Sequence, residues 1–291
     1  YPGDSYEDAG MVQKCASYTF FVIVHIILVV LSLVINGTMQ AVLIAMRKKL
    51  FESTFYIVVA GLMFFTTLKT IIQAVFIVPQ YIKETGYHTY ISHKRFFIID
   101  TLADYGILIF STVMAANRCS MFCLSTHCPF FSRVKLILFV HFSFVIIIVA
   151  ILAGIGCTKE FLPLANAHVD VCPDTAATIT FQQLLVSVYY IACAVSCGFY
   201  IATYWMIRYQ RGVLMKKERN RRGPETVILK QAIIIFGLYL IYIALSKGLP
   251  NLVNDSGEIQ FLLNYALNFV ALLISTAFPG LLLISSMEMR R

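Results

Sequence analysis

The stretch 96-FFIIDTLADYGILIF-110 is an apolar run interrupted by two carboxylic acids, Asp100 and Asp104. Its composition is that of a helix crossing a lipid bilayer, which needs roughly 20 mostly apolar residues. In that setting each ionised acid costs about 2.5–3.5 kcal/mol at the bilayer centre on insertion scales. Two acids within one span therefore require a partner, a ligand or another functional reason.

The composition of the whole chain favours a membrane protein. Of 291 residues, 59% are hydrophobic and only 13% are charged, whereas about a quarter are charged in an ordinary soluble domain. The mean hydropathy is +0.79. We predict an all-α membrane protein, a bundle of seven transmembrane helices within residues 18–285. The predicted spans are Tyr18–Met46, Thr54–Ile82, Arg95–Leu124, Val134–Gly156, Thr180–Ile207, Val227–Gly248 and Ile259–Ser285.

Basic residues predict which side of the membrane each end of the chain occupies. The connections after the first, third and fifth spans, with the C-terminal residues, contain sixteen Lys and Arg residues, and the other side contains six. Because Lys and Arg concentrate in cytoplasmic loops, we expect residues 1–17 outside the cell and residues 286–291 in the cytoplasm. The net charge of +8 is divided among short membrane loops, so it does not indicate nucleic-acid binding. The cluster at 208–230 fits anionic lipid or an acidic protein partner.

Cysteine positions agree with this orientation. Cys15, Cys157 and Cys172 fall on the outside, where disulfides persist. A Cys157–Cys172 bond would close the loop after the fourth span, and pairing of Cys15 with either residue stays open because spacing does not fix connectivity.

Asn254 begins an Asn-x-Ser sequon in the external loop before the last span and is a candidate glycosylation site.

The third span carries two acids and a basic residue on one face. Asp100 and Arg118 are 18 residues apart, which corresponds to five whole helical turns, and Asp104 follows the same face. Lys69 in the second span lies at about the height of Asp104, so we predict a Lys69–Asp104 ion pair. Asp100 would then be spare for a cationic ligand, for protonation or for hydrogen bonding. A purely structural polar network is the competing interpretation.

Other polar residues at helical spacing could face a cavity in the outer half of the bundle. Asn264 and Asn268 recur in the seventh span before a proline, which fits a helix that faces the bundle interior. Tyr190 in the fifth span and Tyr239 and Tyr242 in the sixth could face the same cavity. The six histidines are scattered, so we expect no metal and no cofactor. The candidate ligand-contacting residues are Lys69, Asp100, Asp104, Tyr190, Tyr242, Asn264 and Asn268.

The predicted topology and several short motifs resemble a G-protein-coupled receptor. Asn117-Arg118 closes the third span, and the third cytoplasmic loop is short and basic. The segments 34-VINGT-38 and 276-TAFPG-280 are similar to the Asn and Asn-Pro motifs of the family's first and seventh spans. Three features depart from the family pattern. Asn-Arg-Cys replaces Asp-Arg-Tyr, the outer end of the third span lacks a Cys, and the sixth span lacks its Pro.

These departures resemble the nematode serpentine chemoreceptors, the class-g superfamily with its g, v, x and t groups. Two segments add to the resemblance, 51-FESTFYIVV-59 and 278-FPGLLLISS-286. It implies a plasma-membrane receptor in the sensory cilium of a neuron, which binds a small-molecule odorant or pheromone and activates a heterotrimeric G protein. Asp100 then stands where amine receptors hold a counter-ion carboxylate, while Lys69 could instead serve an acidic ligand. The residues implied for G-protein coupling are Asn117, Arg118, Arg208, Lys216 and Lys217.

The sequence argues against several other classes of membrane protein. A photoreceptor needs a Schiff-base Lys in the seventh span, and Ile259–Ser285 contains none. A transporter usually shows repeated halves and helices broken at the midplane, and an intramembrane hydrolase needs a metal cluster or an activated serine. We see neither pattern and do not expect an enzyme. A transporter or channel subunit with an intramembrane Lys/Asp network is the alternative, and the oligomeric state is not indicated.

Overall fold

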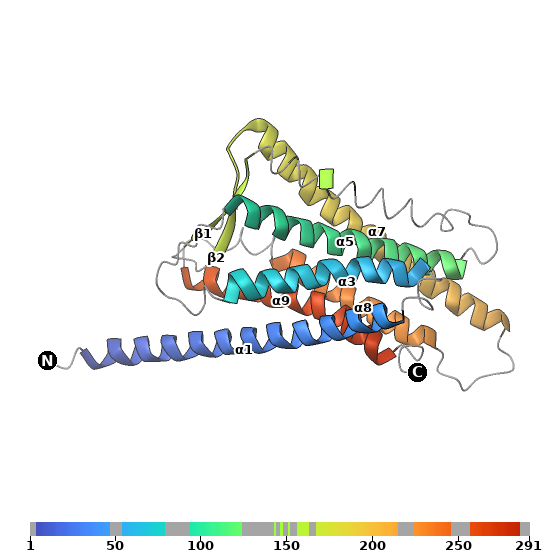
Figure 1. Cartoon of the computed structure of the whole chain (residues 1–291), viewed down its shortest axis with the longest axis horizontal. Coiled ribbons are helices and arrows are strands. Elements are labelled where there is room, and N and C mark those ends of the chain that lie inside the picture. The colour runs from blue at the N-terminus through green and yellow to red at the C-terminus, as the bar shows by residue number, and fades with distance from the viewer. Residues whose placement is uncertain are drawn as a thin grey trace.

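The computed structural model of the chain is a bundle of long helices with one small β-hairpin (Figure 1). The described residues are 4–46, 54–78, 93–123, 143, 146–147, 151, 156–162, 167–214, 224–245 and 257–285. In chain order the elements are α1 (Asp4–Ala45), α3 (Thr54–Ile72), the π-helical turn η1 (Gln73–Ile77), α5 (His93–Cys123), β1 (Thr158–Leu162), β2 (Ala167–Val171), α7 (Ala176–Leu214), α8 (Pro224–Ile243) and α9 (Gly257–Ser285). The predicted helical class is therefore confirmed in outline, with an antiparallel hairpin that the sequence analysis did not predict.

Four segments of these helices are long and apolar enough to cross a bilayer, which indicates a membrane protein. Three of them fall within the predicted first, second and third spans, and the fourth overlaps the predicted fifth span but begins four residues earlier, at Ala176. Shorter apolar helices occur within the predicted sixth and seventh spans, at Ile234–Ile243 and Tyr265–Leu281. The predicted fourth span, Val134–Gly156, lies almost entirely outside the described residues. The four long segments are Thr19–Ala45, Phe55–Ile77, Ile98–Ser120 and Ala176–Met206.

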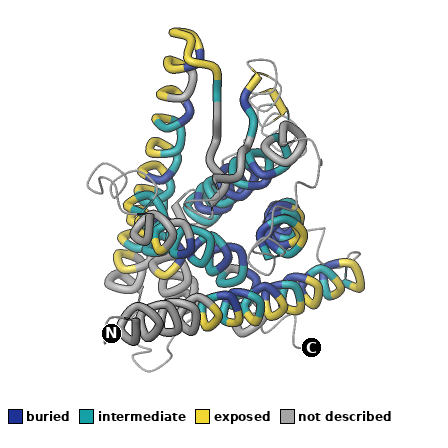
Figure 2. The backbone as a smooth tube through the Cα atoms, turned by 90° about the vertical axis from the view of Figure 1, so that its left-hand side faces the viewer, coloured by how far each residue is buried: buried dark blue, intermediate teal, exposed yellow. Residues whose placement is uncertain are grey.

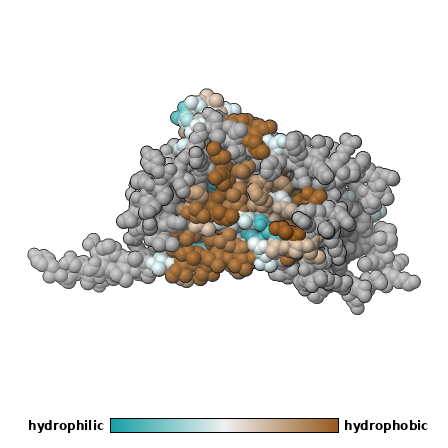
Figure 3. Space-filling view, viewed as in Figure 1, coloured by the Kyte–Doolittle hydropathy of each residue, from teal (hydrophilic) through white to brown (hydrophobic). Residues whose placement is uncertain are grey.

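α1 shows why these helices suit a bilayer. One of its faces is buried and the opposite face is exposed (Figure 2), and the large exposed residues of that face are hydrophobic. Ile27 on that face is 59% exposed, and hydrophobic residues cover much of the described surface in Figure 3. A face of this kind is unfavourable in water but is matched by lipid chains. The buried positions recur at intervals of three or four residues: Val22, His25, Val29, Ser32, Asn36, Met39 and Leu43.

α5 lies at the centre of the bundle, where it packs against α3 and α7. The ring of Phe110 on α5 fills the space beside Gly61 on α3, and the ring of Phe65 on α3 fills the space beside Gly106 on α5. The two rings are in contact, with centroids 5.4 Å apart. A Cβ atom at either glycine would overlap the facing ring, so the glycines determine how closely the two helices approach.

The hairpin after the predicted fourth span is closed at its base by a disulfide. Thr158 pairs with Val171 at the end of the antiparallel register, and Cys157 and Cys172 stand immediately outside that pair and are bonded to each other. The predicted Cys157–Cys172 bond is thus confirmed, and pairing of Cys15 with either residue is ruled out.

The disulfide also locates the two ends of the bundle. Cys157 packs with Leu185 of α7 and with Ile98 and Tyr105 near the start of α5. α5 continues to Cys123, 18 residues beyond Tyr105, a distance of about 27 Å along the helix axis. Cys123 and Cys157 therefore lie at opposite ends of the bundle.

The glycine–phenylalanine contact yields a test of the α3–α5 packing. Replacing Gly61 or Gly106 with Ala should destabilise the protein by about 1–3 kcal/mol, because the facing ring must leave its position. Thermal unfolding of the detergent-purified protein measures this effect. Gly198→Ala on α7 is the matched control, since a Cβ atom there meets nothing within 4 Å. Equal stability of all three variants would contradict the proposed packing constraint.

Candidate functional site

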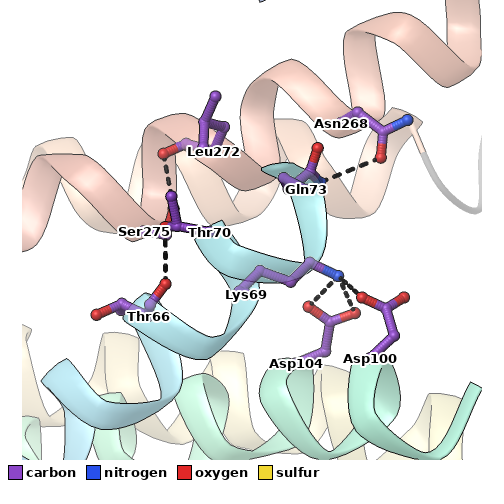
Figure 4. A network of polar contacts seen from close by, with 9 residues as sticks. All are labelled: Thr66, Lys69, Thr70, Gln73, Asp100, Asp104, Asn268, Leu272 and Ser275. Atoms are coloured by element: carbon purple, nitrogen blue, oxygen red, sulfur yellow. Dashed lines mark hydrogen bonds and ion pairs between the residues drawn. The ribbon is translucent and has the colours of Figure 1, made fainter. Parts of the chain in front are cut away.

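Lys69 on α3 and the two acids on α5 meet at the interface between these helices (Figure 4). The Lys69 Nζ atom lies 2.6 Å from Asp100 Oδ1 and 2.9 Å from the Asp104 carboxylate. Residues four apart on a helix stand one above the other on the same face, and an ammonium group has three N–H donors. The Lys69–Asp104 pair is thus as predicted. The prediction that Asp100 stays spare is wrong, because one ammonium group reaches both carboxylates.

The three side chains differ in their access to the surroundings. The Lys69 side chain is 7% exposed and that of Asp100 is 8% exposed, whereas that of Asp104 is 31% exposed. Asp104 is therefore the accessible acid of the cluster, and Asp100 is the buried one.

Three tyrosines from α7 and α8 lie in the hydrophobic core that these helices share with α3 and α5. The rings of Tyr189 and Tyr242 have centroids 6.2 Å apart. The Tyr239 hydroxyl lies 3.3 Å from the Ser111 hydroxyl of α5. These contacts bring α5, α7 and α8 together in the core.

The predicted ligand residues from the other spans differ in whether they face the interior of the bundle. Tyr242 is half-buried in this group, whereas Tyr190 lies on an exposed face of α7 and is 44% exposed. The preceding residue, Tyr189, is the one that faces α8. Asn268 on α9 accepts a hydrogen bond from Gln73 Nε2 at 3.4 Å. The side chain of Asn264 lies outside the described residues.

An uncharged polar network joins α1, α3 and α9 beside the charged cluster. Asn36 Nδ2 donates to the Ser32 hydroxyl at 3.1 Å, and the Thr66 hydroxyl donates to Asn36 Oδ1 at 3.3 Å. The Thr276 hydroxyl donates to Ser32 at 2.7 Å, and Ser32 and Thr70 share a further hydrogen bond. Hydrogen bonds of this kind hold membrane helices together where no water competes. The residues of the two motifs at 34–38 and 276–280 thus meet in space.

Gln73 extends this network toward the outer end of α3. It begins the π-helical turn η1 and is buried, and its Oε1 atom lies 3.1 Å from His25 Nε2 of α1. With its bond to Asn268, the Gln73 side chain joins α1 to α9. π-Helical turns often occur at functional sites, and this one follows Lys69 by one helical turn.

The predicted G-protein-coupling residues that the structure describes lie toward the C-terminal ends of α5 and α7. The Arg118 guanidinium carbon lies 3.8 Å from the centroid of the Phe55 ring on α3, a cation–π contact. Asn117 is buried and its carbonyl oxygen accepts a hydrogen bond from the Ser120 hydroxyl. Arg208 on α7 is exposed and donates to the Tyr204 hydroxyl at 2.7 Å. Lys216, Lys217 and the glycosylation candidate Asn254 lie outside the described residues.

The sequence analysis missed much of the uncharged network, although α3 contained a usable signal. Thr66, Lys69, Thr70 and Gln73 are spaced by three, one and three residues, so they form one polar face of a helix. All four are buried. Only the charged member of this face was considered as a candidate. Tyr189 carried no comparable signal, because α7 is apolar on nearly all sides.

Comparison with known families matches nearly the whole chain. A family model described as "Protein of unknown function (DUF621)" matches residues 8–291. The match includes every helix and strand described above apart from the first residues of α1. No curated protein matches the chain.

The buried ion cluster yields a stability test. Lys69→Met should destabilise the protein by about 3–5 kcal/mol, because it leaves the buried Asp100 and the partly exposed Asp104 without their ammonium partner. The triple variant Lys69→Met/Asp100→Asn/Asp104→Asn should recover much of this loss, since the charges are removed together. Thermal unfolding and the amount of folded protein at the cell surface measure both effects. Wild-type stability of Lys69→Met would show that the ion cluster does not hold α3 to α5.

Proposed function

Because the chain belongs to the DUF621 family, whose description assigns no function, we propose from the site itself that the protein is a seven-helix receptor that activates a heterotrimeric G protein. It binds a small molecule, of the odorant or pheromone type, in the outer half of the bundle. It acts on the G protein at the cytoplasmic face around Arg118. The plasma membrane, and by resemblance a sensory cilium, is its site of action.

The arrangement along α5 carries this proposal. The charged cluster at Asp100 and Asp104 lies toward one end of the helix, and Arg118 lies toward the other, with 14 residues between Asp104 and Arg118. This separation is about 21 Å along the axis. One continuous helix therefore links an accessible polar group to a cation at the opposite end of the bundle, as a transmembrane receptor requires.

The disulfide and the basic residues support an outward-facing N-terminus. Cys157–Cys172 lies at the same end of the bundle as Ile98 and the start of α5, and disulfides persist outside the cytosol. Arg118 and Arg208 lie toward the opposite end, and basic residues favour the cytoplasmic side. The opposite placement of Cys123 and Cys157 supports a further crossing between them, which would bring the number of spans to seven.

This topology is testable with epitope tags. A tag before residue 1 should be accessible to antibody on intact cells, whereas a tag after residue 291 should become accessible only after permeabilisation. The reason is that an odd number of crossings places the two ends on opposite sides. Tags exposed on the same side would contradict the seven-span topology, and reversed exposure would contradict its orientation.

Signalling in this proposal is a shift between two states of the bundle. A ligand can move such an equilibrium only by binding one state more tightly than the other. In the proposed receptor the ligand contacts lie between α5, α7 and α8, a proposal supported by the tyrosines of α7 and α8 that pack against the core. A change in the position of α7 and α8 would then open the cytoplasmic end around Arg118 to the G protein.

Nucleotide exchange on a purified heterotrimeric G protein tests this function. The reconstituted receptor is exposed to a panel of small amines, carboxylates and neutral odorants, and we expect at least one compound to raise the exchange rate. Arg118→Ala should return that rate to its basal value, because the cation at the G-protein cavity is lost. Arg95→Ala, at the outer end of the same helix, is the matched control and should preserve the response.

Two results would contradict the receptor proposal. One is a ligand response that survives Arg118→Ala at normal surface expression. The other is a panel in which no compound alters nucleotide exchange while some compound crosses the membrane or opens an ion conductance. The second result would favour the alternative, a transporter or channel subunit.

A further inference from the structure

The C-terminal part of α7 presents an apolar, an aromatic and a cationic side chain on one face. Ile201 is 53% exposed and Trp205 is 67% exposed, and Arg208 is also exposed. Their spacings of four and three residues keep them within about 60° of one another around the helix. Toward the end of α7 this face therefore changes from apolar to aromatic and then to cationic.

The order of these side chains matches the layers of a bilayer. The part of α7 that is long and apolar enough to cross a membrane ends at Met206. Ile201 and Trp205 lie within it, and Arg208 lies just beyond it. Tyr209, the next residue, is 69% exposed, and tryptophan and tyrosine concentrate where acyl chains meet headgroups. This end of α7 is therefore placed at the level of the lipid headgroups.

The Arg208 guanidinium group turns back toward the bilayer. Its Nη1 atom donates a hydrogen bond to the Tyr204 hydroxyl at 2.7 Å, one helical turn nearer to the span, as the N-terminal tilt of helical side chains favours. No acid among the described residues forms an ion pair with it. A guanidinium group has five N–H donors, and their planar arrangement matches the oxygens of a phosphate group. The cation thus lies where lipid phosphates lie.

We propose that this face of α7 binds an anionic phospholipid, with the lipid phosphate on Arg208 and an acyl chain along Trp205 and Ile201. The three side chains together fit an amphiphile, because an acidic segment of a soluble protein would satisfy Arg208 but leave the apolar part of the face uncovered. The receptor resemblance implied a role for Arg208 in G-protein coupling, whereas its exposed neighbours point to lipid. The inference goes beyond the proposed function and requires only that α7 crosses a membrane.

The fluorescence of Trp205 tests this site directly, because it is the single tryptophan of the chain. The protein is reconstituted in vesicles of phosphatidylcholine with phosphatidylserine as the minor lipid. Two preparations have the same lipid proportions and differ only in which lipid carries brominated acyl chains, which quench tryptophan on contact. A series of proportions converts the quenching into the share of each lipid beside Trp205.

We expect phosphatidylserine to be enriched beside Trp205 by roughly fivefold over its share of the bilayer, the ratio that corresponds to about 1 kcal/mol per basic residue near the membrane surface. Arg208→Gln should remove most of this enrichment, because the counter-charge is lost, whereas Arg208→Lys keeps the charge and should retain most of it. Arg118→Gln is the matched control. It removes the same charge from a residue whose guanidinium group contacts Phe55, and it should leave the enrichment unchanged.

Three results would overturn the inference. Shares of the two lipids beside Trp205 that equal their shares of the bilayer would show no preference for the anionic lipid. Enrichment that survives Arg208→Gln would assign the counter-charge to another residue. A lack of quenching by either brominated lipid would show that Trp205 does not face acyl chains. The assay needs neither a ligand nor a G protein, so its outcome is separate from that of the nucleotide-exchange test.

Discussion

The contact between Lys69 and the two acids of α5 is the interaction on which the described bundle depends. Each of the three charges alone would be unfavourable in a span, because neither lipid nor apolar side chains replace water around an ion. Together they are mutually compensated at the interface of two central helices, with Nζ within 3 Å of both acids. The contact therefore requires α3 and α5 to be neighbours at a fixed height, and the other helices pack around this pair.

α3 has a second role, because its polar face contacts α5 on one side and α1 and α9 on the other. Lys69 turns toward α5, whereas Thr66, Thr70 and Gln73 turn toward α1 and α9. The charged contacts and the uncharged contacts are thus kept apart, although they come from consecutive turns of one helix. This division lets α9 be held by hydrogen bonds that do not depend on the state of the ion cluster.

The sequence predicted the helices and the existence of a Lys–Asp contact better than it predicted the environment of each side chain. Long apolar runs identify spans directly, and heights along two helices are enough to pair Lys69 with Asp104. A comparison of positions along two helix axes pairs each charged residue with one partner. It therefore paired Lys69 with Asp104 and led to the wrong expectation that Asp100 stays spare. The choice between Tyr189 and Tyr190 depends on the rotation of α7, and a helix that is apolar all round does not reveal its rotation. The hairpin was missed because its strands, 158–162 and 167–171, are only five residues each and the first does not alternate between polar and apolar residues.

The rigid and adjustable parts of the bundle can be distinguished from its packing. Below the ion cluster, Phe65 and Phe110 fill the spaces beside Gly106 and Gly61, so α3 and α5 are fixed to each other at two successive levels. In α8, by contrast, a Cβ atom at Gly237 meets nothing within 4 Å, so this glycine sets no such limit on how α8 packs.

In the receptor proposed above, a ligand would therefore act on the position of α7 and α8 against a fixed α3–α5 pair. Arg118 and Phe55 belong to that fixed pair and are in contact at its inner end. The movement of α7 and α8, rather than a movement of Arg118 itself, is then what would expose the arginine to a partner protein.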